Sequence, residues 1–407
     1  MAENSNLASA KNAKKDEFYT QYSDIEAEMN AYITFNPDVF RGKTILLPCD
    51  DPECSNFTRY FASNFVRFGL KKLISTSYAF SSGNANMTRL EANSPLYDAA
   101  KHETCGKLFI LEVDTDGNGS VDEDDMVFAR YLEGDGDFRS EEVTKLRDEA
   151  DIIITNPPFS LFREFVSWIM EAQKQFIIIG NVNAITYKEF FPYLKENLVW
   201  LGYSIHSGDR AFYVPDDYPL NAAGCGVDEQ GRRFIRVKGV RWFTNIDHCG
   251  RHEPLILDTK AHNLKYNKKL KKKFCDSNGV VSYPLYDNYD AIEVPFTECI
   301  PSDYDGFMGV PITFLDKYCP EQFDIVGLLQ SSTDEQAGIP NLRYYNDFKE
   351  MRQDMSFTGS SGGKANGNPV VKGKSQKGNF LFNPVTGEYV HSVYARILIR
   401  HKKGVNT

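Results

Sequence analysis

The chain has 407 residues, a formal net charge of −10, 42% hydrophobic residues and 13% aromatic residues. This length predicts two or three domains, and the apolar content is ample for sizeable cores, so disulfide staples are not needed. No run of about 18 apolar residues occurs, which excludes a transmembrane helix, and the polar segment Met1–Lys15 lacks the apolar stretch of a signal peptide. Eight cysteines without C-x-x-C spacing fit a reducing cytoplasm.

Residues 1–15 are expected to be disordered, and strands and helices then alternate over residues 16–200. A helix is indicated by phenylalanines at helical spacing from Phe57 to Phe68, before Gly69, and a second helix by the apolar face that follows Ser160. The predicted strands are Thr44–Leu47, Lys72–Tyr78, Lys107–Val113, Asp151–Thr155 and Phe176–Ile179. This alternation predicts an α/β fold with a doubly wound, mostly parallel sheet.

From residue 201 onward the apolar runs shorten and alternate with polar residues, as in Phe234–Phe243. Residues 201–355 are therefore predicted to form a β-rich second region. Residues 356–379 are rich in glycine, serine, lysine and asparagine, which predicts a flexible loop. Residues 380–407 contain a predicted final strand at Tyr394–Arg400.

Four residues directly follow the isoleucine-rich strand: Asn156, Pro157, Pro158 and Phe159. Ligands of open α/β sheets bind at the carboxyl ends of the strands. The Asn156 side-chain oxygen and the Pro157 carbonyl can accept hydrogen bonds from an exocyclic amino group, while Phe159 can stack on a flat base. The prolines restrict the backbone. The pattern predicts methylation of an amino nitrogen, although Asn-Pro-Pro alone is also a common strand-to-turn signal.

The first strand ends in the acidic segment Pro48–Glu53, which has no G-x-G-x-x-G motif, and this argues against a dinucleotide ligand. Asp50 and Glu53 suit a cationic or hydroxyl-bearing ligand such as S-adenosylmethionine. An exposed acidic turn is the alternative interpretation.

Two basic runs stand out in this acidic chain, Arg232–Arg241 and Lys260–Lys273, and neither contains an acidic residue. Each alone could be a solvated face, but two runs in the same half, beside Trp242 and Phe243, favour a DNA-facing surface. The candidate DNA-binding residues are Arg232, Arg233, Arg236, Lys238, Arg241, Lys268 and Lys269.

Residues 114–125 match a calcium-binding loop, in which Gly119 takes the turn position. The predicted element before the loop is a strand rather than a helix, and the last ligand position is aspartate rather than a bidentate glutamate. An acidic surface loop is the preferred interpretation, and methyl transfer needs no metal. The ligand positions would be Asp114, Asp116, Asn118, Ser120 and Asp125.

Several blocks together resemble the EcoRI-type adenine-specific DNA methyltransferases, and the resemblance covers most of the chain. The blocks are Asp16–Thr20, Leu47–Glu53, Gly134–Ser140, Thr155–Ser160, Ile178–Tyr187, Arg236–Thr244 and Tyr304–Phe314. The resemblance implies direct transfer of a methyl group from S-adenosylmethionine to N6 of an adenine that is flipped out of double-stranded DNA.

The resemblance also implies individual roles. The tetrapeptide Asn156–Phe159 would be catalytic, and Asp137 and Phe138 would hold the cofactor adenine by a hydrogen bond and by stacking. The second strand ends in Ser77-Tyr78, without the acid that often binds the ribose hydroxyls in this class of fold. The implied cofactor-binding residues are Phe18, Tyr19, Thr20, Asp50, Asp137 and Phe138.

The expected partner is double-stranded DNA, and the expected protein is a monomer. The enzyme would belong to a restriction–modification system, in which an endonuclease acts on the same DNA site without direct contact with the methyltransferase. Alternatively, it would be an orphan enzyme, which modifies DNA without such an endonuclease. Two alternatives stay open at this point. A protein-glutamine methyltransferase uses a similar tetrapeptide but typically has a glycine-rich first loop, which is missing here. A calcium-binding module on a degenerate methyltransferase fold is opposed by the intact donor site and tetrapeptide.

Overall fold

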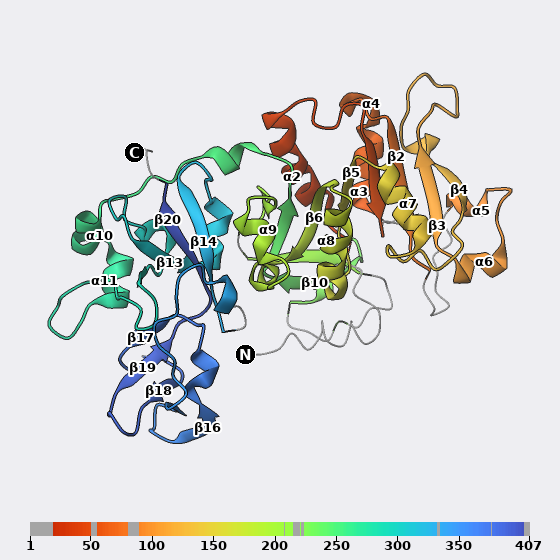
Figure 1. The fold of residues 1–407 in the computed structure, drawn as a ribbon. Coiled ribbons are helices and arrows are strands. Elements are labelled where there is room, and N and C mark those ends of the chain that lie inside the picture. Colours follow the sequence, from red (N-terminus) through yellow and green to blue (C-terminus); the bar gives the residue numbers. More distant parts are fainter. Residues whose placement is uncertain are drawn as a thin grey trace. The chain divides into compact units, whose positions relative to one another are not determined.

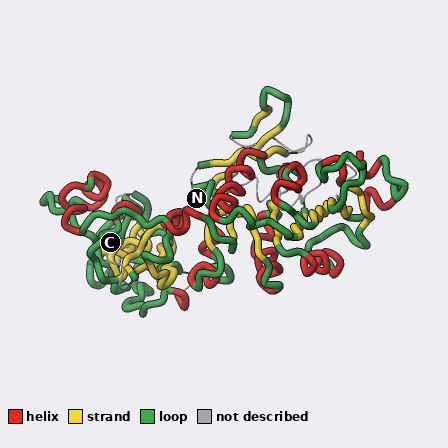
Figure 2. The backbone as a smooth tube through the Cα atoms, turned by 90° about the horizontal axis from the view of Figure 1, so that it is seen from above, coloured by secondary structure: helices red, strands yellow, loops and turns green. Residues whose placement is uncertain are grey.

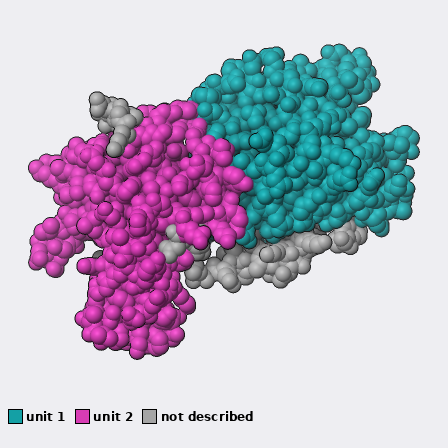
Figure 3. All heavy atoms as spheres, viewed as in Figure 1, with its two compact units in different colours: residues 1–184, 199–249 teal, residues 185–198, 250–407 magenta. Residues whose placement is uncertain are grey.

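The computed structural model describes residues 19–49, 55–79, 89–206, 208–214, 220, 224–331, 334–375 and 377–402. The chain forms two compact units, coloured separately in Figure 3. Unit 1 comprises Met1–Ala184 and Val199–Cys249, and unit 2 comprises Ile185–Leu198 and Gly250–Thr407. No helix in the described part of the chain is long and apolar enough to cross a membrane.

An eight-stranded sheet with the order β4-β3-β2-β1-β5-β6-β11-β7 forms the centre of unit 1 (Figure 1). Its four middle strands are parallel neighbours, which confirms the predicted doubly wound sheet. These strands are β1 (Thr44–Pro48), β2 (Lys72–Ser77), β5 (Ile152–Thr155) and β6 (Gln175–Asn181). The flanking strands β3 (Lys107–Leu111), β4 (Val127–Tyr131), β7 (Trp200–Leu201) and β11 (Val240–Thr244) pair antiparallel to their neighbours.

Helices cover both faces of this sheet, as Figure 2 shows by red helices on either side of yellow strands. On one face, Ile45, Ile152 and Ile177 join one apolar core with side chains of α2 (Tyr22–Phe35) and α3 (Asn56–Ser63). Burial on both faces explains why β1, β5 and β6 contain apolar runs rather than an alternating pattern.

The opposite face is covered by α7 (Glu141–Glu149) and α8 (Phe162–Glu171). Gly180 of β6 leaves room for Phe162, because a Cβ at Gly180 would lie 2.3 Å from the Phe162 ring. The two helices are joined where the Trp168 indole N–H donates to Thr144 Oγ1 at 3.1 Å. The predicted second helix therefore exists, but it begins two residues after Ser160, behind the 3-10 turn Phe159–Leu161.

The predicted phenylalanine-rich helix is present but interrupted. Ser55 caps α3 by accepting hydrogen bonds from Phe57 N and Thr58 N, an interaction that typically contributes about 1 kcal/mol. Asn64 then breaks the helix, and a short helix α4 (Phe65–Phe68) ends at Gly69, whose φ is 63°. A side chain at this left-handed position would be strained, so glycine ends the helix as predicted.

A small antiparallel sheet, β8-β10-β9, also belongs to unit 1. Its strands are β8 (Asp209–Tyr213), β9 (Gly226–Val227) and β10 (Arg233–Lys238). Only Gly239, with a φ of 71°, separates β10 from β11 of the large sheet. The predicted boundary at residue 200 is therefore not where the units divide, because β11 is a fully buried strand of the large sheet, paired with β6.

Unit 2 contains a four-stranded sheet, β12-β13-β20-β14, and a five-stranded sheet, β16-β15-β18-β19-β17. The first comprises β12 (Ala291–Glu293), β13 (Phe307–Pro311), β14 (Phe323–Leu329) and β20 (Arg396–His401). The second comprises β15 (Lys349–Met351), β16 (Phe357–Ser361), β17 (Val370–Lys372), β18 (Phe380–Phe382) and β19 (Tyr389–Ser392). The helices are α9 (Phe191–Lys195), α10 (Lys260–Tyr266) and α11 (Lys268–Phe274).

The segment 356–379, predicted as a flexible loop, instead contributes β16 and β17 to the five-stranded sheet. Its glycines serve packing as well as turns. A Cβ on Gly362 would lie 2.3 Å from the Tyr345 carbonyl oxygen, so the small residue permits a close backbone approach. The predicted C-terminal strand is present as β20.

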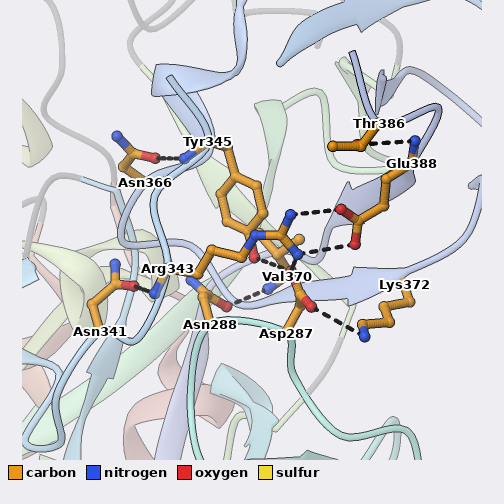
Figure 4. Close-up of polar contacts among 10 residues, drawn as sticks. All are labelled: Asp287, Asn288, Asn341, Arg343, Tyr345, Asn366, Val370, Lys372, Thr386 and Glu388. Carbon is orange, nitrogen blue, oxygen red and sulfur yellow. Dashed lines mark hydrogen bonds and ion pairs between the residues drawn. The ribbon is translucent and has the colours of Figure 1, made fainter. Parts of the chain in front are cut away.

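A partly buried polar network connects the segments of unit 2 shown in Figure 4. The Arg343 guanidinium donates to Asp287 Oδ2 at 2.7 Å and to both Glu388 oxygens at 2.9 and 2.6 Å. The Tyr345 hydroxyl donates to the same Asp287 oxygen at 2.9 Å. Charged groups that share hydrogen bonds in this way connect the 287 turn, the 343–345 segment and the turn before β19.

The Arg343–Glu388 pair predicts an acid-sensitive contribution to stability. The hydrogen bond from Arg343 holds the pKa of Glu388 below its ordinary value. Its stabilisation is therefore complete above the unfolded carboxyl pKa of about 4.3 and is lost as the pH falls through the lower folded pKa. We expect Glu388→Gln to reduce the free energy of unfolding by about 1–3 kcal/mol at neutral pH, with the difference from wild type vanishing in strong acid.

Urea unfolding at a series of pH values measures this difference. Glu253→Gln is the matched control, since Glu253 is exposed and has no ion pair within the described residues. A Glu388→Gln difference that stayed constant down to pH 3 would contradict the expectation.

Candidate active site

The strand order of the large sheet reverses between β1 and β5. From β1 the chain proceeds to β2 on one side, and β5 and β6 lie on the other side. Such a reversal opens a crevice in which ligands of α/β sheets bind. The backbone ladder between β1 and β5 reaches only Leu46↔Ile153. Beyond it, the buried Thr155 hydroxyl donates to the Pro48 carbonyl at 2.7 Å and joins the two strands where the backbone ladder has ended.

The tetrapeptide Asn156–Phe159 begins immediately after this hydrogen bond. Pro157 is buried, while Asn156, Pro158 and Phe159 are partly buried. The Phe159 ring lies edge-on to Phe212 of β8, with the centroids 6.4 Å apart. The small sheet thus holds the aromatic member of the tetrapeptide in a defined orientation beside the crevice.

The N-terminal block approaches the same region of unit 1. Tyr19 exchanges two backbone hydrogen bonds with Tyr213 of β8, at 2.9 and 3.0 Å. The Thr20 carbonyl accepts from the Asn56 side chain at 2.7 Å, at the start of α3. Thr20 is buried, and its hydroxyl has no hydrogen-bond partner among the described residues. Phe18 and Asp50, the other predicted cofactor residues at these positions, lie outside the described residues.

The loop between β4 and α7 carries Asp137 and Phe138. The Asp137 carboxylate accepts from Arg139 Nε at 2.9 Å and Nη2 at 2.6 Å, and Arg139 also donates to Glu164. The hydrogen bond to Asp137 raises the pKa of Arg139 above its ordinary value. Sequence reasoning missed Arg139, although its place two residues after the acid was a usable signal.

Phe138 lies in the core rather than on an open surface. Its ring packs against Phe165 and Trp168 of α8, with centroids 4.9 and 5.5 Å away, and only 3% of the residue is exposed. The ring therefore anchors the loop to α8, and this placement does not support the predicted stacking on a ligand.

The basic residues of β10 differ in how far their side chains are exposed. Arg236 and Lys238 are exposed and alternate with the buried Ile235 and Val237, as the two-residue period of a strand requires. Arg233 is half-buried on the same strand.

Arg232 lies just before β10 and has a partner in the same unit. It pairs with Asp228 at 2.8 Å, and its guanidinium carbon lies 4.2 Å from the Tyr213 ring centroid.

The prediction that Arg241 lies on a DNA-facing surface is wrong. The residue is only 4% exposed, and its guanidinium donates to the carbonyls of Val240 and His206 at 2.8 and 2.5 Å. It lies on β11, inside the large sheet, where an exposed position is not available.

In unit 2, Lys268 and Lys269 are exposed on α11, whose Leu270 is fully buried. Asn267 caps this helix by accepting a hydrogen bond from Leu270 N at 3.0 Å. Lys269 forms an ion pair with Glu298, whereas Lys268 has no ion-pair partner within the described residues.

The acidic loop 114–125 follows a strand, β3, as predicted. Ligand atoms of Asp114, Asp116 and Asp125 lie within 4.8 Å of one another. The Asp125 carboxylate accepts hydrogen bonds from Thr115 and Asp116 N–H groups, and the bonds from Thr115 hold its pKa below the ordinary value. Asn118 and Ser120 are exposed members of the same loop. The loop thus organises its own carboxylates through backbone hydrogen bonds.

A doubly wound sheet with an Asn-Pro-Pro-Phe tetrapeptide at its strand-order reversal defines a methyltransferase that acts on amino groups. A family model described as adenine-specific methyltransferase EcoRI matches residues 6–402. The chain belongs to this family of adenine-specific methyltransferases.

Two type II methyltransferases agree with this assignment. The chain is 42% identical to the type II methyltransferase M.EcoRI of Escherichia coli over 325 residues, which cover 80% of this chain and 89% of that protein. It is 34% identical to the type II methyltransferase M.MpnI of Mycoplasma pneumoniae over 322 residues, covering 79% of this chain and 84% of that protein. A putative RNA methyltransferase from Pyrococcus horikoshii aligns structurally at 12% identity, with a TM-score of 0.25, over 60% of this chain and 98% of that one.

The bridge from Thr155 to Pro48 predicts a role for the hydroxyl in both stability and rate. Thr155→Val keeps the shape but removes the donor, so we expect a loss of about 1–3 kcal/mol in the free energy of unfolding. Because sub-ångström displacement of a reacting group slows catalysis, we also expect methyl transfer to fall by about tenfold or more. Thr155→Ser should retain both properties; equal behaviour of the Val and Ser variants in denaturation and single-turnover assays would contradict the role.

Proposed function

We propose that this chain is a site-specific DNA methyltransferase that transfers a methyl group from S-adenosylmethionine to N6 of an adenine flipped out of double-stranded DNA. The observation that carries the proposal is the position of Asn156–Phe159, which starts beside the Thr155–Pro48 bridge at the opening of the crevice. Membership of the adenine-specific family supports the choice of base.

The tetrapeptide supplies the groups that methyl transfer to an amino nitrogen needs. The adenine amino nitrogen is a poor nucleophile because its lone pair is delocalised into the ring. Hydrogen bonds from that amino group to the Asn156 side-chain oxygen and the Pro157 carbonyl favour a pyramidal nitrogen, whose lone pair is free to attack. Phe159, oriented by Phe212, stacks on the flipped base, and flipping itself costs a few kcal/mol.

The residues around the crevice fit an adenosyl sulfonium cofactor. A buried Thr20 hydroxyl without a described partner offers a hydrogen bond to a ligand beside the start of α3. The Asp137 carboxylate is oriented by Arg139 and can accept from the cofactor adenine amino group. When bound, S-adenosylmethionine supplies an electrophilic methyl group. Tyr19, Phe18 and Asp50 are included on the strength of the family resemblance.

DNA contacts are proposed from both units. In unit 1, Arg236 and Lys238 present exposed charges on β10, with Arg233 and the partnered Arg232 beside them.

In unit 2, the exposed lysines of α11 concentrate positive charge on one short helix. None of Lys268, Lys271, Lys272 and Lys273 has an ion-pair partner within the described ranges. Phosphates favour such lysines, and base edges favour arginines or amides.

The proposed setting is a cytoplasmic modification enzyme that acts as a monomer. It would protect DNA in a restriction–modification system, beside an endonuclease of the same site, or modify DNA as an orphan enzyme. The family match supports this proposal over a protein-glutamine acceptor.

Asn156→Ala tests the reaction directly. Purified protein is incubated with methyl-labelled S-adenosylmethionine and bacterial DNA lacking adenine methylation. We expect label in N6-methyladenine with the wild type and a rate about 100- to 1,000-fold lower for Asn156→Ala, the loss typical of removing one catalytic hydrogen-bonding group.

The control is Asn93→Ala, an exposed asparagine in unit 1, which should react at the wild-type rate. Binding of S-adenosylhomocysteine by Asn156→Ala should stay within about twofold of wild type, because an interaction made only in the transition state affects the rate and not ground-state binding. Cofactor binding by the wild type without any label in DNA would overturn the proposal and direct attention to protein or RNA acceptors.

Lys272→Ala tests the α11 surface through the salt dependence of DNA binding. Removing one lysine that neutralises a phosphate reduces the magnitude of the slope of log K against log salt concentration by about 0.9. We expect this reduction for Lys272→Ala and a smaller one for Lys269→Ala, since Glu298 already neutralises Lys269. Lys145→Ala, an exposed lysine of α7 paired with Glu141, should leave the slope unchanged. Equal slopes for Lys272→Ala and wild type, in fluorescence-anisotropy titrations, would exclude this lysine from the interface.

A further inference from the structure

The loop that follows β4 is attached to the end of β2 at Asp135. The Ala79 N–H donates to the Asp135 carbonyl at 2.7 Å. The Tyr78 hydroxyl donates to Asp135 Oδ2 at 2.9 Å. Backbone and side chain of one aspartate are therefore both held by the two residues that follow β2.

Two glycines make this attachment possible. Gly136 has a φ of 85°, and a Cβ there would lie 2.5 Å from the Ser77 carbonyl oxygen. A Cβ on Gly106 would lie 2.5 Å from the Gly136 Cα. Side chains at either glycine would push the loop away from β2. The close backbone approach at these two glycines therefore holds Asp135 near the end of β2.

The Asp135 carboxylate still has capacity for a ligand. Asp135 is exposed, Oδ1 accepts from Asp137 N at 3.1 Å, and Oδ2 accepts from Tyr78. An ionised carboxylate offers about four acceptor positions, so further donors can bind. Asp137, by contrast, already accepts from Arg139, while Asp135 has no cationic partner within the described residues.

The position of Asp135 matters because β2 has no acid of its own there. The strand ends in Ser77-Tyr78, and β1 and β2 are parallel neighbours whose carboxyl ends share one edge of the sheet. A carboxylate at that edge is the group that typically accepts hydrogen bonds from the hydroxyls of a bound ribose. We propose that Asp135, supplied by the loop after β4, binds the ribose hydroxyls of the adenosyl cofactor in place of an acid on β2.

This inference rests on the proposed use of S-adenosylmethionine, and it is tested by binding rather than by turnover. The ligands are S-adenosylhomocysteine and an analogue of it that lacks both ribose hydroxyls, measured by isothermal titration calorimetry. The proteins are the wild type, Asp135→Asn, Asp135→Ala and the control Glu133→Gln, which changes an exposed acid of the same loop. Thermal melting checks that each variant is folded.

We expect the wild type and Glu133→Gln to bind S-adenosylhomocysteine about 10- to 100-fold more tightly than the analogue, the range for hydrogen bonds to a charged group. Asp135→Asn and Asp135→Ala should bind S-adenosylhomocysteine correspondingly less tightly and should discriminate between the two ligands by less than about threefold. Full discrimination in a folded Asp135→Asn protein would overturn the inference. So would equal weakening of both ligands, because that outcome means that Asp135 only shapes the loop.

The outcomes separate the two proposals. If the wild type binds S-adenosylhomocysteine with the expected discrimination, and the folded Asp135 variants lose it, but no label is transferred to DNA, the DNA reaction fails and the role of Asp135 stands. If the wild type methylates DNA but binds both ligands equally, the reaction stands and the role of Asp135 fails. A wild type that binds neither ligand contradicts both.

Discussion

The active region depends on how β1 and β5 are joined at their carboxyl ends. The connections that leave these parallel neighbours lead to opposite sides of the sheet, and the backbone ladder between the two strands stops at Leu46↔Ile153. Proline at position 48 offers a carbonyl but no N–H, so the next contact falls to the Thr155 hydroxyl. This side-chain hydrogen bond joins the end of the strand that leads to the proposed cofactor site to the end of the strand that carries the tetrapeptide.

Much of unit 1 could be predicted because its middle strands are buried on both faces. Runs such as Ile152–Ile154 permit few other placements, and the five strands predicted before residue 200 all exist. The antiparallel flanks could not be predicted in the same way. The pattern of β11 merges with that of β10, and only the pairing of β11 with β6 places it in the large sheet.

Individual side chains were less predictable than strands. Arg241 looks like its basic neighbours, yet it is buried because β11 is an interior strand. Phe138 follows an acid that fits a cofactor, but its ring fills a space between the loop and α8. In the segment 356–379, glycine and serine indicate a loop by composition, whereas Gly362 is small because a carbonyl oxygen lies close by. Amino-acid composition indicates which local structures a segment can adopt, whereas the neighbours of each side chain depend on the fold.

The single residue between β10 and β11 has a mechanical consequence. The Gly239 carbonyl accepts from Val182 N at 2.6 Å, and a Cβ on Gly239 would lie 3.0 Å from the Val182 side chain. The strand β10, which carries Arg236 and Lys238, is therefore joined to β11 of the large sheet by one residue that is itself held against Val182. An inserted or deleted residue at this junction would have to be taken up in the ladders of β10 or β11, and a one-residue slip in a ladder moves its side chains to the opposite face. The exposed positions of Arg236 and Lys238 on β10 can then vary by exchange of side chains, but not by a change in the length of the strand.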